Sequence, residues 1–173
     1  TTCDGSTIIG GQEIPCTGEH GHIDLTGAIA HSCNVYFAEA AQELGAAKLA
    51  AEAKKFLYNS DMDFADLVMA SSVYDKPSGK SDTAWSAIGQ YHDLVTPLHA
   101  CMIAGAIAND GVMMEPKLLL SVSGGASSGY TFSPAVAARP MSAAVADDLT
   151  EMMIACVTGG TGKKAAIDGY VIA

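Results

Sequence analysis

The sequence has little charge and few basic side chains. Only 16% of its 173 residues are charged, and 9 Lys and Arg face 19 Asp and Glu, which gives a formal net charge of −10. Because no cluster of Lys and Arg is available to neutralise a phosphate backbone, the composition excludes nucleic-acid binding as a main function. The hydrophobic share of 49% excludes an intrinsically disordered chain. These figures fit one compact, acidic domain.

The chain also lacks a long hydrophobic run. Its longest apolar stretch, Leu98–Ala108, includes a histidine and falls well short of the ~18 residues that cross a bilayer, so it predicts a buried helix. No signal-peptide pattern opens the sequence, and Thr1 is not a natural start. We therefore expect the chain to be part of a longer protein.

The five cysteines include no C-x2-4-C pair, the spacing most typical of structural zinc sites. Three of them lie in apolar, helix-like surroundings, which predicts that they are small core residues: Cys33, Cys101 and Cys156.

Cys3 and Cys16 flank a Gly-rich segment that predicts a small hairpin turning at Gly10-Gly11. Three states are open to this pair: a disulfide in an oxidising compartment, two free thiols in a reducing one, or a zinc site completed by His20 and His22. The H-x-H spacing is unusual for structural zinc and disfavours the last of these.

The remaining pattern is mainly helical. Asp24 predicts the N-cap of a short helix over residues 25–30, and Ser142 predicts the N-cap of the last helix, which ends at Gly159-Gly160. Further helices are expected over Val35–Leu44, Ala46–Tyr58 and from Thr96-Pro97 to about Asn109. We expect a strand over Lys117–Ser123 and loops over Asn59–Gly79 and Ser123–Ser133. The fold class is therefore mainly α, with a small N-terminal hairpin and little other strand.

Other motifs favour structural roles. Gly159–Lys164 fails the phosphate-loop pattern, since position 157 lacks the glycine and position 164 lacks the hydroxyl that the pattern requires. The eight methionines fit core positions. The five histidines have no acidic partner placed to form a Ser-His-Asp triad.

Ser32-Cys33-Asn34 is by itself no more than a polar kink between two helices. Its surroundings, however, resemble the transpeptidase domain of penicillin-binding proteins. The segments His20–Leu25 and Ala28–Phe37 are similar to the "HG-x-[IV]-[DS]-[LF]…AL-x-x-SCN-x-x-F" run of that family, which carries its second active-site motif.

The resemblance continues in the expected order along the chain. Ala87–Gln90, Leu94–Leu98 and Ile107–Gly111 are similar to the "IGQ…TPL…IAN-x-G" stretch of class B members, and Glu115–Leu118 matches the "P-x-L" exit into a strand. The match is closest to the monofunctional D,D-transpeptidases of class B.

This resemblance implies serine acyl transfer without a cofactor. In the family, the serine of an S-x-x-K motif attacks the peptide bond before a terminal D-alanine. Ser32 would relay a proton between that lysine and the leaving amine. Asn34 would hydrogen-bond the peptide amide of the substrate and help to hold the lysine. Ser32 and Asn34 are thus the candidate catalytic residues.

The sequence departs from the family in having neither S-x-x-K nor K-T-G. We therefore expect the helical subdomain of the penicillin-binding-protein and serine β-lactamase-like fold, with residues 1–23 as a hairpin lead-in and 24–173 as the helical part. Without the nucleophile, the chain alone should be inactive and should not be acylated by β-lactams. An exposed apolar patch beside Ser32 and Asn34, or a dimer that covers it, is expected where the missing half would pack.

The parent protein is expected to cross-link peptidoglycan stem peptides, to bind β-lactams and to act on the cell-wall side of the cytoplasmic membrane. An N-terminal helix outside these residues would anchor it there. Two alternatives are a β-lactam-sensing receptor domain, which flanking signalling segments would reveal, and a stand-alone helical interaction module.

Overall fold

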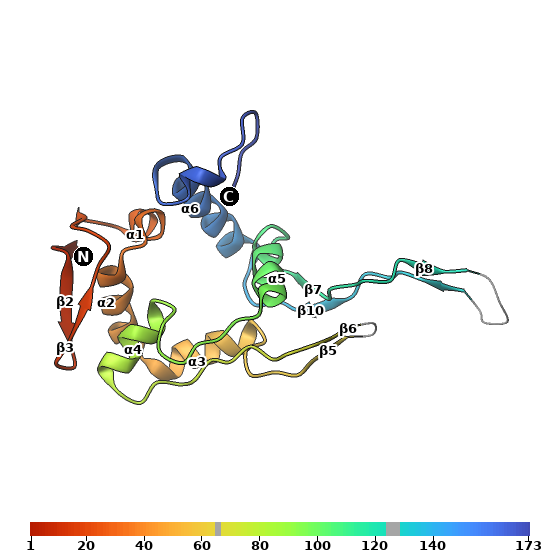
Figure 1. Ribbon diagram of the computed structural model, residues 1–173, viewed down its shortest axis with the longest axis horizontal. Coiled ribbons are helices and arrows are strands. Elements are labelled where there is room, and N and C mark those ends of the chain that lie inside the picture. The colour runs from red at the N-terminus through yellow and green to blue at the C-terminus, as the bar shows by residue number, and fades with distance from the viewer. Residues whose placement is uncertain (65–66, 124–128) are drawn as a thin grey trace.

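The helices form the frame of the molecule. The computed structural model describes residues 1–64, 67–123 and 129–173. Its helices are α1 (Leu25–His31), α2 (Asn34–Leu44), α3 (Ala46–Lys55), α4 (Lys80–Ala87), α5 (Pro97–Ile107), α6 (Ala143–Gly159) and the short 3-10 helix η1 (Lys163–Ala165). The helices follow one another around an open ring, in which α6 returns to pack against α1 (Figure 1).

Short strands pair two by two and antiparallel. They are β1 (Thr2–Cys3) with β4 (Gly21–His22), β2 (Ser6–Ile9) with β3 (Gln12–Pro15), β5 (Met62–Phe64) with β6 (Leu67–Met69), β7 (Met113–Met114) with β10 (Val136–Ala138), and β8 (Ser121–Val122) with β9 (Tyr130–Thr131). Figure 1 shows β8 and the β5–β6 hairpin extending away from the ring, on the side opposite the N-terminal strands. The mainly α prediction is confirmed for the frame, although strand pairs are more numerous than expected.

The predicted N-caps are confirmed. Asp24 Oδ1 accepts the backbone N–H of Gly27 at 2.8 Å at the start of α1. Thr96 and Ser142 cap α5 and α6 in the same way, and Pro97 occupies the first turn of α5. A cap is a local interaction within four residues, which is why the sequence predicts it well.

The hairpin at Gly10-Gly11 is also confirmed. Both glycines have positive φ angles, 61° and 81°, a conformation that suits a two-residue turn between twisted strands. Its buried Ile9 and Ile14 pack with Ala38 of α2 and Ala84 of α4. The N-terminal hairpin thus joins the helical frame through its own apolar cluster.

Several expected boundaries were wrong. The third helix ends at Lys55 rather than Tyr58, and the expected loop over Asn59–Gly79 contains the β5–β6 hairpin. Strand structure within Lys117–Ser123 is confined to β8. The expected loop over Ser123–Ser133 contains β9, and its residues 124–128 lie outside the described residues. β5 pairs with β6 and β8 pairs with β9, and these strands of two or three residues are too short to show the alternating pattern by which a strand is predicted.

Burial on α5 is one-sided, contrary to the expected buried helix. His99, Met102 and Ala106 are buried at three- and four-residue steps, whereas Cys101 is exposed. Cys156 is only half-buried, so the predicted core role holds for Cys33 alone of the three cysteines. Met62, Met102 and Met113 do fill the core, as expected for part of the methionine set.

Exposed apolar side chains are spread over many elements. Leu25 of α1 is 41% exposed, and others lie far from Ser32 in sequence, on β6, the α4–α5 connection and the C-terminal tail: Val68, Leu94, Tyr170 and Val171. The exposed apolar surface is therefore more widely distributed than the single patch expected beside Ser32 and Asn34.

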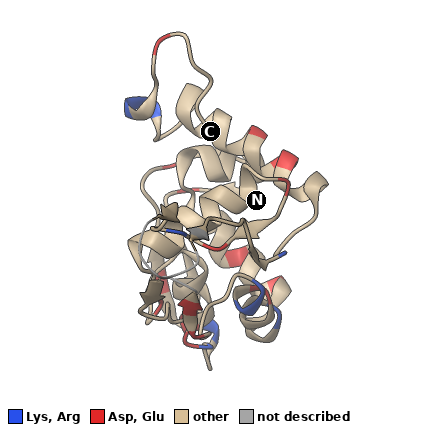
Figure 2. Ribbon diagram, turned by 90° about the vertical axis from the view of Figure 1, so that its right-hand side faces the viewer, with Lys and Arg blue, Asp and Glu red and all other residues tan. Residues whose placement is uncertain are grey.

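Charged residues are scattered along the ribbon in the view of Figure 2. Across the described ranges, the helices are too short or too polar to cross a membrane.

Candidate functional site

The Ser32-Cys33-Asn34 segment forms a tight turn between α1 and α2. Ser32 is the C-cap of α1 and adopts the left-handed conformation, with φ 55° and ψ 54°. The backbone N–H of Cys33 donates to Ala28 O at 2.9 Å, which closes the helix end. The turn leaves Ser32 exposed, buries Cys33 and leaves Asn34 half-buried. Both predicted catalytic residues therefore lie on one turn.

Asn34 is held by the N-terminal hairpin. Its side-chain Nδ2 donates to the carbonyl oxygen of Pro15 at 2.8 Å, and its backbone N–H donates to Cys16 Sγ at 3.3 Å. A primary amide has two N–H groups and a carbonyl oxygen. Within the part of the chain that the structure describes, the second N–H and Oδ1 of Asn34 have no hydrogen-bond partner. The amide is thus fixed in place and retains both a donor and an acceptor.

The C-terminal end of α6 supports the turn from the other side. The backbone N–H of Thr161 donates to Ala30 O at 2.9 Å, two residues before Ser32. A Cβ added at Gly160 would lie 2.6 Å from the carbonyl carbon of Ala30, so only glycine allows this approach. The Gly159–Lys164 segment therefore has a packing role, in agreement with the rejection of a phosphate loop.

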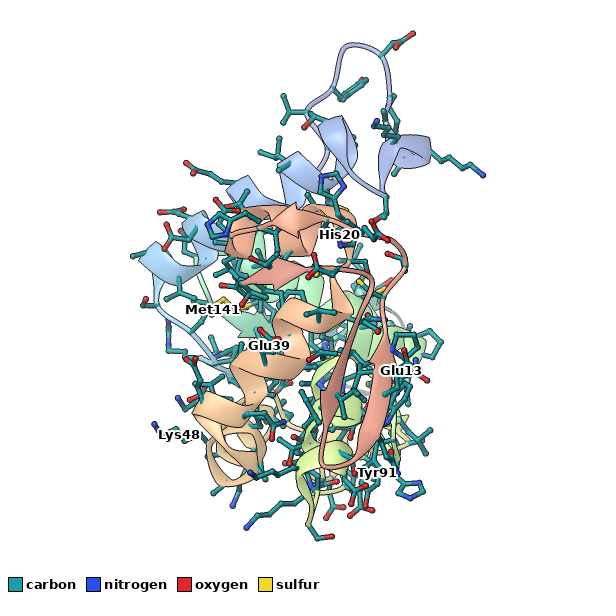
Figure 3. The ribbon with its side chains drawn as sticks, turned by 90° about the vertical axis from the view of Figure 1, so that its left-hand side faces the viewer. Glu13, His20, Glu39, Lys48, Tyr91 and Met141 are labelled. Atoms are coloured by element: carbon teal, nitrogen blue, oxygen red, sulfur yellow. The ribbon has the colours of Figure 1, made fainter. Side chains whose placement is uncertain are left out.

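The middle residue of the motif belongs to a cluster of sulfur and nitrogen ligands. Cys16 Sγ lies 3.9 Å from Cys33 Sγ and 3.6 Å from His20 Nδ1. With the Sγ of Cys3, these four ligand atoms all lie within 4.8 Å of one another. Figure 3 labels His20 beside the N-terminal strands and α1.

The disulfide considered for Cys3 and Cys16 is absent, since both are free thiols. The zinc alternative placed His22 in the ligand set; His22 lies exposed on β4, and Cys33 takes its place in the cluster. Sequence reasoning missed Cys33 because helix-like surroundings suggested a plain core residue. Twelve residues separate Cys33 from His20, so no short spacing pattern connected it with the other ligands.

The pKa values of Cys16 and Cys33 are shifted in opposite directions within the cluster. Burial by itself would raise the pKa of Cys16, but hydrogen bonds from the backbone of Val35, Gly18 and Asn34 and from the Cys3 thiol lower that pKa to about 6. Burial raises the pKa of Cys33 to about 12, and the neighbouring Cys3 and Cys16 contribute to the rise.

Comparison with known proteins gives the chain its family. The model of the penicillin-binding protein transpeptidase domain matches residues 1–173. The chain belongs to this family. The resemblance seen in the S-x-N, "IGQ…TPL" and "P-x-L" blocks is thereby confirmed.

Curated relatives of the chain include peptidoglycan D,D-transpeptidases. PbpA of Mycolicibacterium smegmatis is 34% identical over 160 residues, which cover 92% of this chain and 32% of the relative. PbpA of Mycobacterium tuberculosis is 31% identical over 165 residues, with the same coverage. The chain thus spans about a third of the length of these relatives.

Solved structures of transpeptidases agree with the fold. The D,D-transpeptidase domain of a peptidoglycan glycosyltransferase from Eggerthella lenta superposes with a TM-score of 0.90 at 29% identity, covering 100% of this chain and 46% of that one. The imipenem acyl-enzyme complex of penicillin-binding protein A from M. tuberculosis gives a TM-score of 0.89 at 28% identity, covering 99% and 41%. The chain therefore has the fold of a portion of the transpeptidase domain.

Proposed function

We propose that the chain is the S-x-N-bearing, largely helical part of a class B D,D-transpeptidase that cross-links peptidoglycan stem peptides by serine acyl transfer. Residues 1–23 form its hairpin lead-in and 24–173 its helical part. The observation that carries this proposal is the Ser32–Asn34 turn, which presents a hydroxyl and a half-satisfied amide on one short segment. The naming of the relatives as D,D-transpeptidases supports the reaction class.

The chemistry assigned to the turn follows from its donors and acceptors. The exposed hydroxyl of Ser32 can both accept and donate a proton, as a relay between the lysine of the first motif and the leaving amine requires. The free N–H and Oδ1 of Asn34 would bind the substrate peptide and that lysine. The nucleophile and its lysine are supplied by residues outside this sequence, so the chain alone is inactive in this proposal.

β-Lactams are the proposed inhibitors, because they acylate the same nucleophile in place of the stem peptide. The penicillin-binding protein A structure with imipenem is described as an acyl-enzyme, which supports this assignment. The substrate places the protein on the cell-wall side of the cytoplasmic membrane, with the anchor in a segment outside residues 1–173.

The proposal is tested with a hybrid in which residues 1–173 replace the matching stretch of M. smegmatis PbpA. Labelling by a fluorescent penicillin should be retained by the hybrid and absent from the 173-residue chain alone. Ser32→Ala in the hybrid should slow acylation by about 10²–10⁴-fold, the usual contribution of a positioned acid–base group. Ser78→Ala, at an exposed position away from the turn, is the matched control.

Two results would contradict the proposal. One is covalent labelling of the isolated chain at a serine. The other is a folded hybrid, judged by circular dichroism, whose acylation rate is the same for Ser32→Ala and Ser78→Ala.

A further inference from the structure

The Cys3, Cys16, His20 and Cys33 cluster brings together three thiols and an imidazole from four separate parts of the N-terminal region. Cys3 lies on β1, Cys16 just after β3, His20 just before β4, and Cys33 between α1 and α2. Backbone bonds hold the first three in register: Cys16 N–H donates to Gly5 O at 2.8 Å and His20 N–H donates to Cys3 O at 3.0 Å. The four side chains are thus delivered by ordered backbone to one point.

Two separations among the ligand atoms match those of a tetrahedral zinc site, and all four atoms lie within 4.8 Å of one another. With Zn–S bonds of about 2.3 Å and Zn–N bonds of about 2.0–2.1 Å, a regular tetrahedron separates two sulfurs by about 3.8 Å and a sulfur from a nitrogen by about 3.6 Å. The observed separations are 3.9 Å between Cys16 Sγ and Cys33 Sγ, and 3.6 Å between Cys16 Sγ and His20 Nδ1.

Neither a disulfide nor simple core packing accounts for the cluster. A disulfide between Cys16 and Cys33 would require their sulfurs at about 2.0 Å, roughly half the observed separation. Packing of small apolar residues accounts for Cys3 and Cys33, which are fully buried, and a hydrogen bond accounts for the 3.6 Å contact of Cys16 Sγ with His20 Nδ1, but neither explains why all four groups converge on one point. A cation at the centre would satisfy all four groups at once.

We propose that Cys3, Cys16, His20 and Cys33 form a structural Zn²⁺ site of the Cys₃His type. Soft thiolates with one imidazole in a closed tetrahedral arrangement favour Zn²⁺ over hard cations. The thiols bind as thiolates, and their protons are released to solvent as the metal enters. With four protein ligands, the site has no open position for a substrate, so its role is structural.

Cys33 connects the proposed zinc site to the S-x-N turn. The metal would hold Cys33, which lies directly between Ser32 and Asn34, and Cys16, whose Sγ accepts the backbone N–H of Asn34. It would therefore fasten the turn to the base of the N-terminal hairpin. The proposed metal site can be tested independently of the proposed transpeptidase function, because metal content can be measured without any activity.

The first experiment measures the metal in the full 173-residue chain, purified without a polyhistidine tag. Elemental analysis should find one zinc per chain. X-ray absorption at the zinc edge should find three sulfurs at about 2.3 Å and one nitrogen at about 2.0–2.1 Å. Zinc well below one per chain after growth in zinc-supplemented medium, two or fewer sulfurs, or a Cys16–Cys33 disulfide in the peptide mass spectrum would each overturn the proposal.

Variants identify the ligands. Outer partners of metal ligands already change metal affinity by about 10–100-fold, so removing a ligand in Cys3→Ala or His20→Ala should lower zinc affinity by more than about 100-fold. His22→Ala and Cys101→Ala, two exposed residues outside the cluster, are matched controls and should retain the zinc. Equal zinc loss in the controls would overturn the ligand assignment.

A second measurement keeps the test independent of how well the variants fold. Co²⁺ added to the wild-type chain should give the visible d–d bands of a tetrahedral site and a near-ultraviolet thiolate-to-metal band, and both should vanish when excess Zn²⁺ is added. A Co²⁺ spectrum without the thiolate band would refute the site.

Discussion

Replacing Gly160 with alanine tests the contact between α6 and the S-x-N region most directly. The added Cβ would lie 2.6 Å from the carbonyl carbon of Ala30, which belongs to the rigid backbone of α1. A flexible side chain could move aside, but here either α1 or the α6 terminus must shift. We therefore expect Gly160→Ala to separate the two helices.

The magnitude follows from two contributions. Overpacking a close contact costs about 1–3 kcal/mol. The shift also weakens the hydrogen bond from Thr161 N–H to Ala30 O, which contributes about 0.5–1.5 kcal/mol. Together they predict a loss of about 1.5–4.5 kcal/mol, which for a domain of this size lowers Tm by roughly 3–18 °C.

The neighbouring Gly159 provides a matched control. A Cβ at Gly159 meets nothing within 4 Å, and this residue is the last of α6. Gly159→Ala should therefore be neutral or stabilise the chain by up to about 1 kcal/mol, since alanine restricts the unfolded state. Urea unfolding followed by circular dichroism gives both values. Ordinary surface substitutions change the free energy of unfolding by up to about 0.5 kcal/mol. If the free energies of unfolding of the two variants differ by less than this amount, the proposed steric contact is refuted.

Two further substitutions test buried polar groups. Ser72→Ala should cost about 2–4 kcal/mol in urea unfolding, because it strands His99 Nδ1, now 2.7 Å from Ser72 Oγ, and the backbone N–H of Thr96; exposed Ser71→Ala is the control, and equal effects would contradict this reasoning. Burial raises the pKa of Asp93, and the negative charge of the nearby Asp75 adds to the rise. The folded chain therefore binds this proton more tightly than the unfolded chain does, and the contribution of Asp93 to stability falls as pH rises above the ordinary Asp pKa of 3.8. Asp93→Asn should thus stabilise the chain more at pH 7 than at pH 4, and a gain that does not change with pH would argue against the assignment.

Local signals account for what the sequence predicts well. The caps at Asp24, Thr96 and Ser142 and the glycine pair at positions 10 and 11 each act within a few residues. The same reasoning missed α4, whose N-cap Gly79 makes no side-chain hydrogen bond and whose sequence is largely polar. That helix forms because Ala84 packs against the N-terminal hairpin and α2, and such long-range packing leaves no local pattern.

For the same reason, only the part of the site that depends on a short local motif could be predicted. Ser32 and Asn34 lie two residues apart, so a short motif and its flanking blocks were enough to propose them. The cysteine cluster follows the pattern C-x12-C-x3-H-x12-C. The residues at the two ends of each long interval come together only after β1 pairs with β4 and α1 turns back toward these strands. A short stretch of sequence encodes neither event.

The bond from Thr161 to Ala30 also sets an order of events during folding. Its partners are 131 residues apart, so the chain must close a long loop before the segment after α6 can complete the C-terminal end of α1. Closing so long a loop is slow compared with forming a helix or a hairpin. The N-terminal hairpin and its cysteine cluster can therefore fold early, whereas the S-x-N turn gains its second support only after α6 has docked. A chain that ends before residue 160 would hold the motif from one side only.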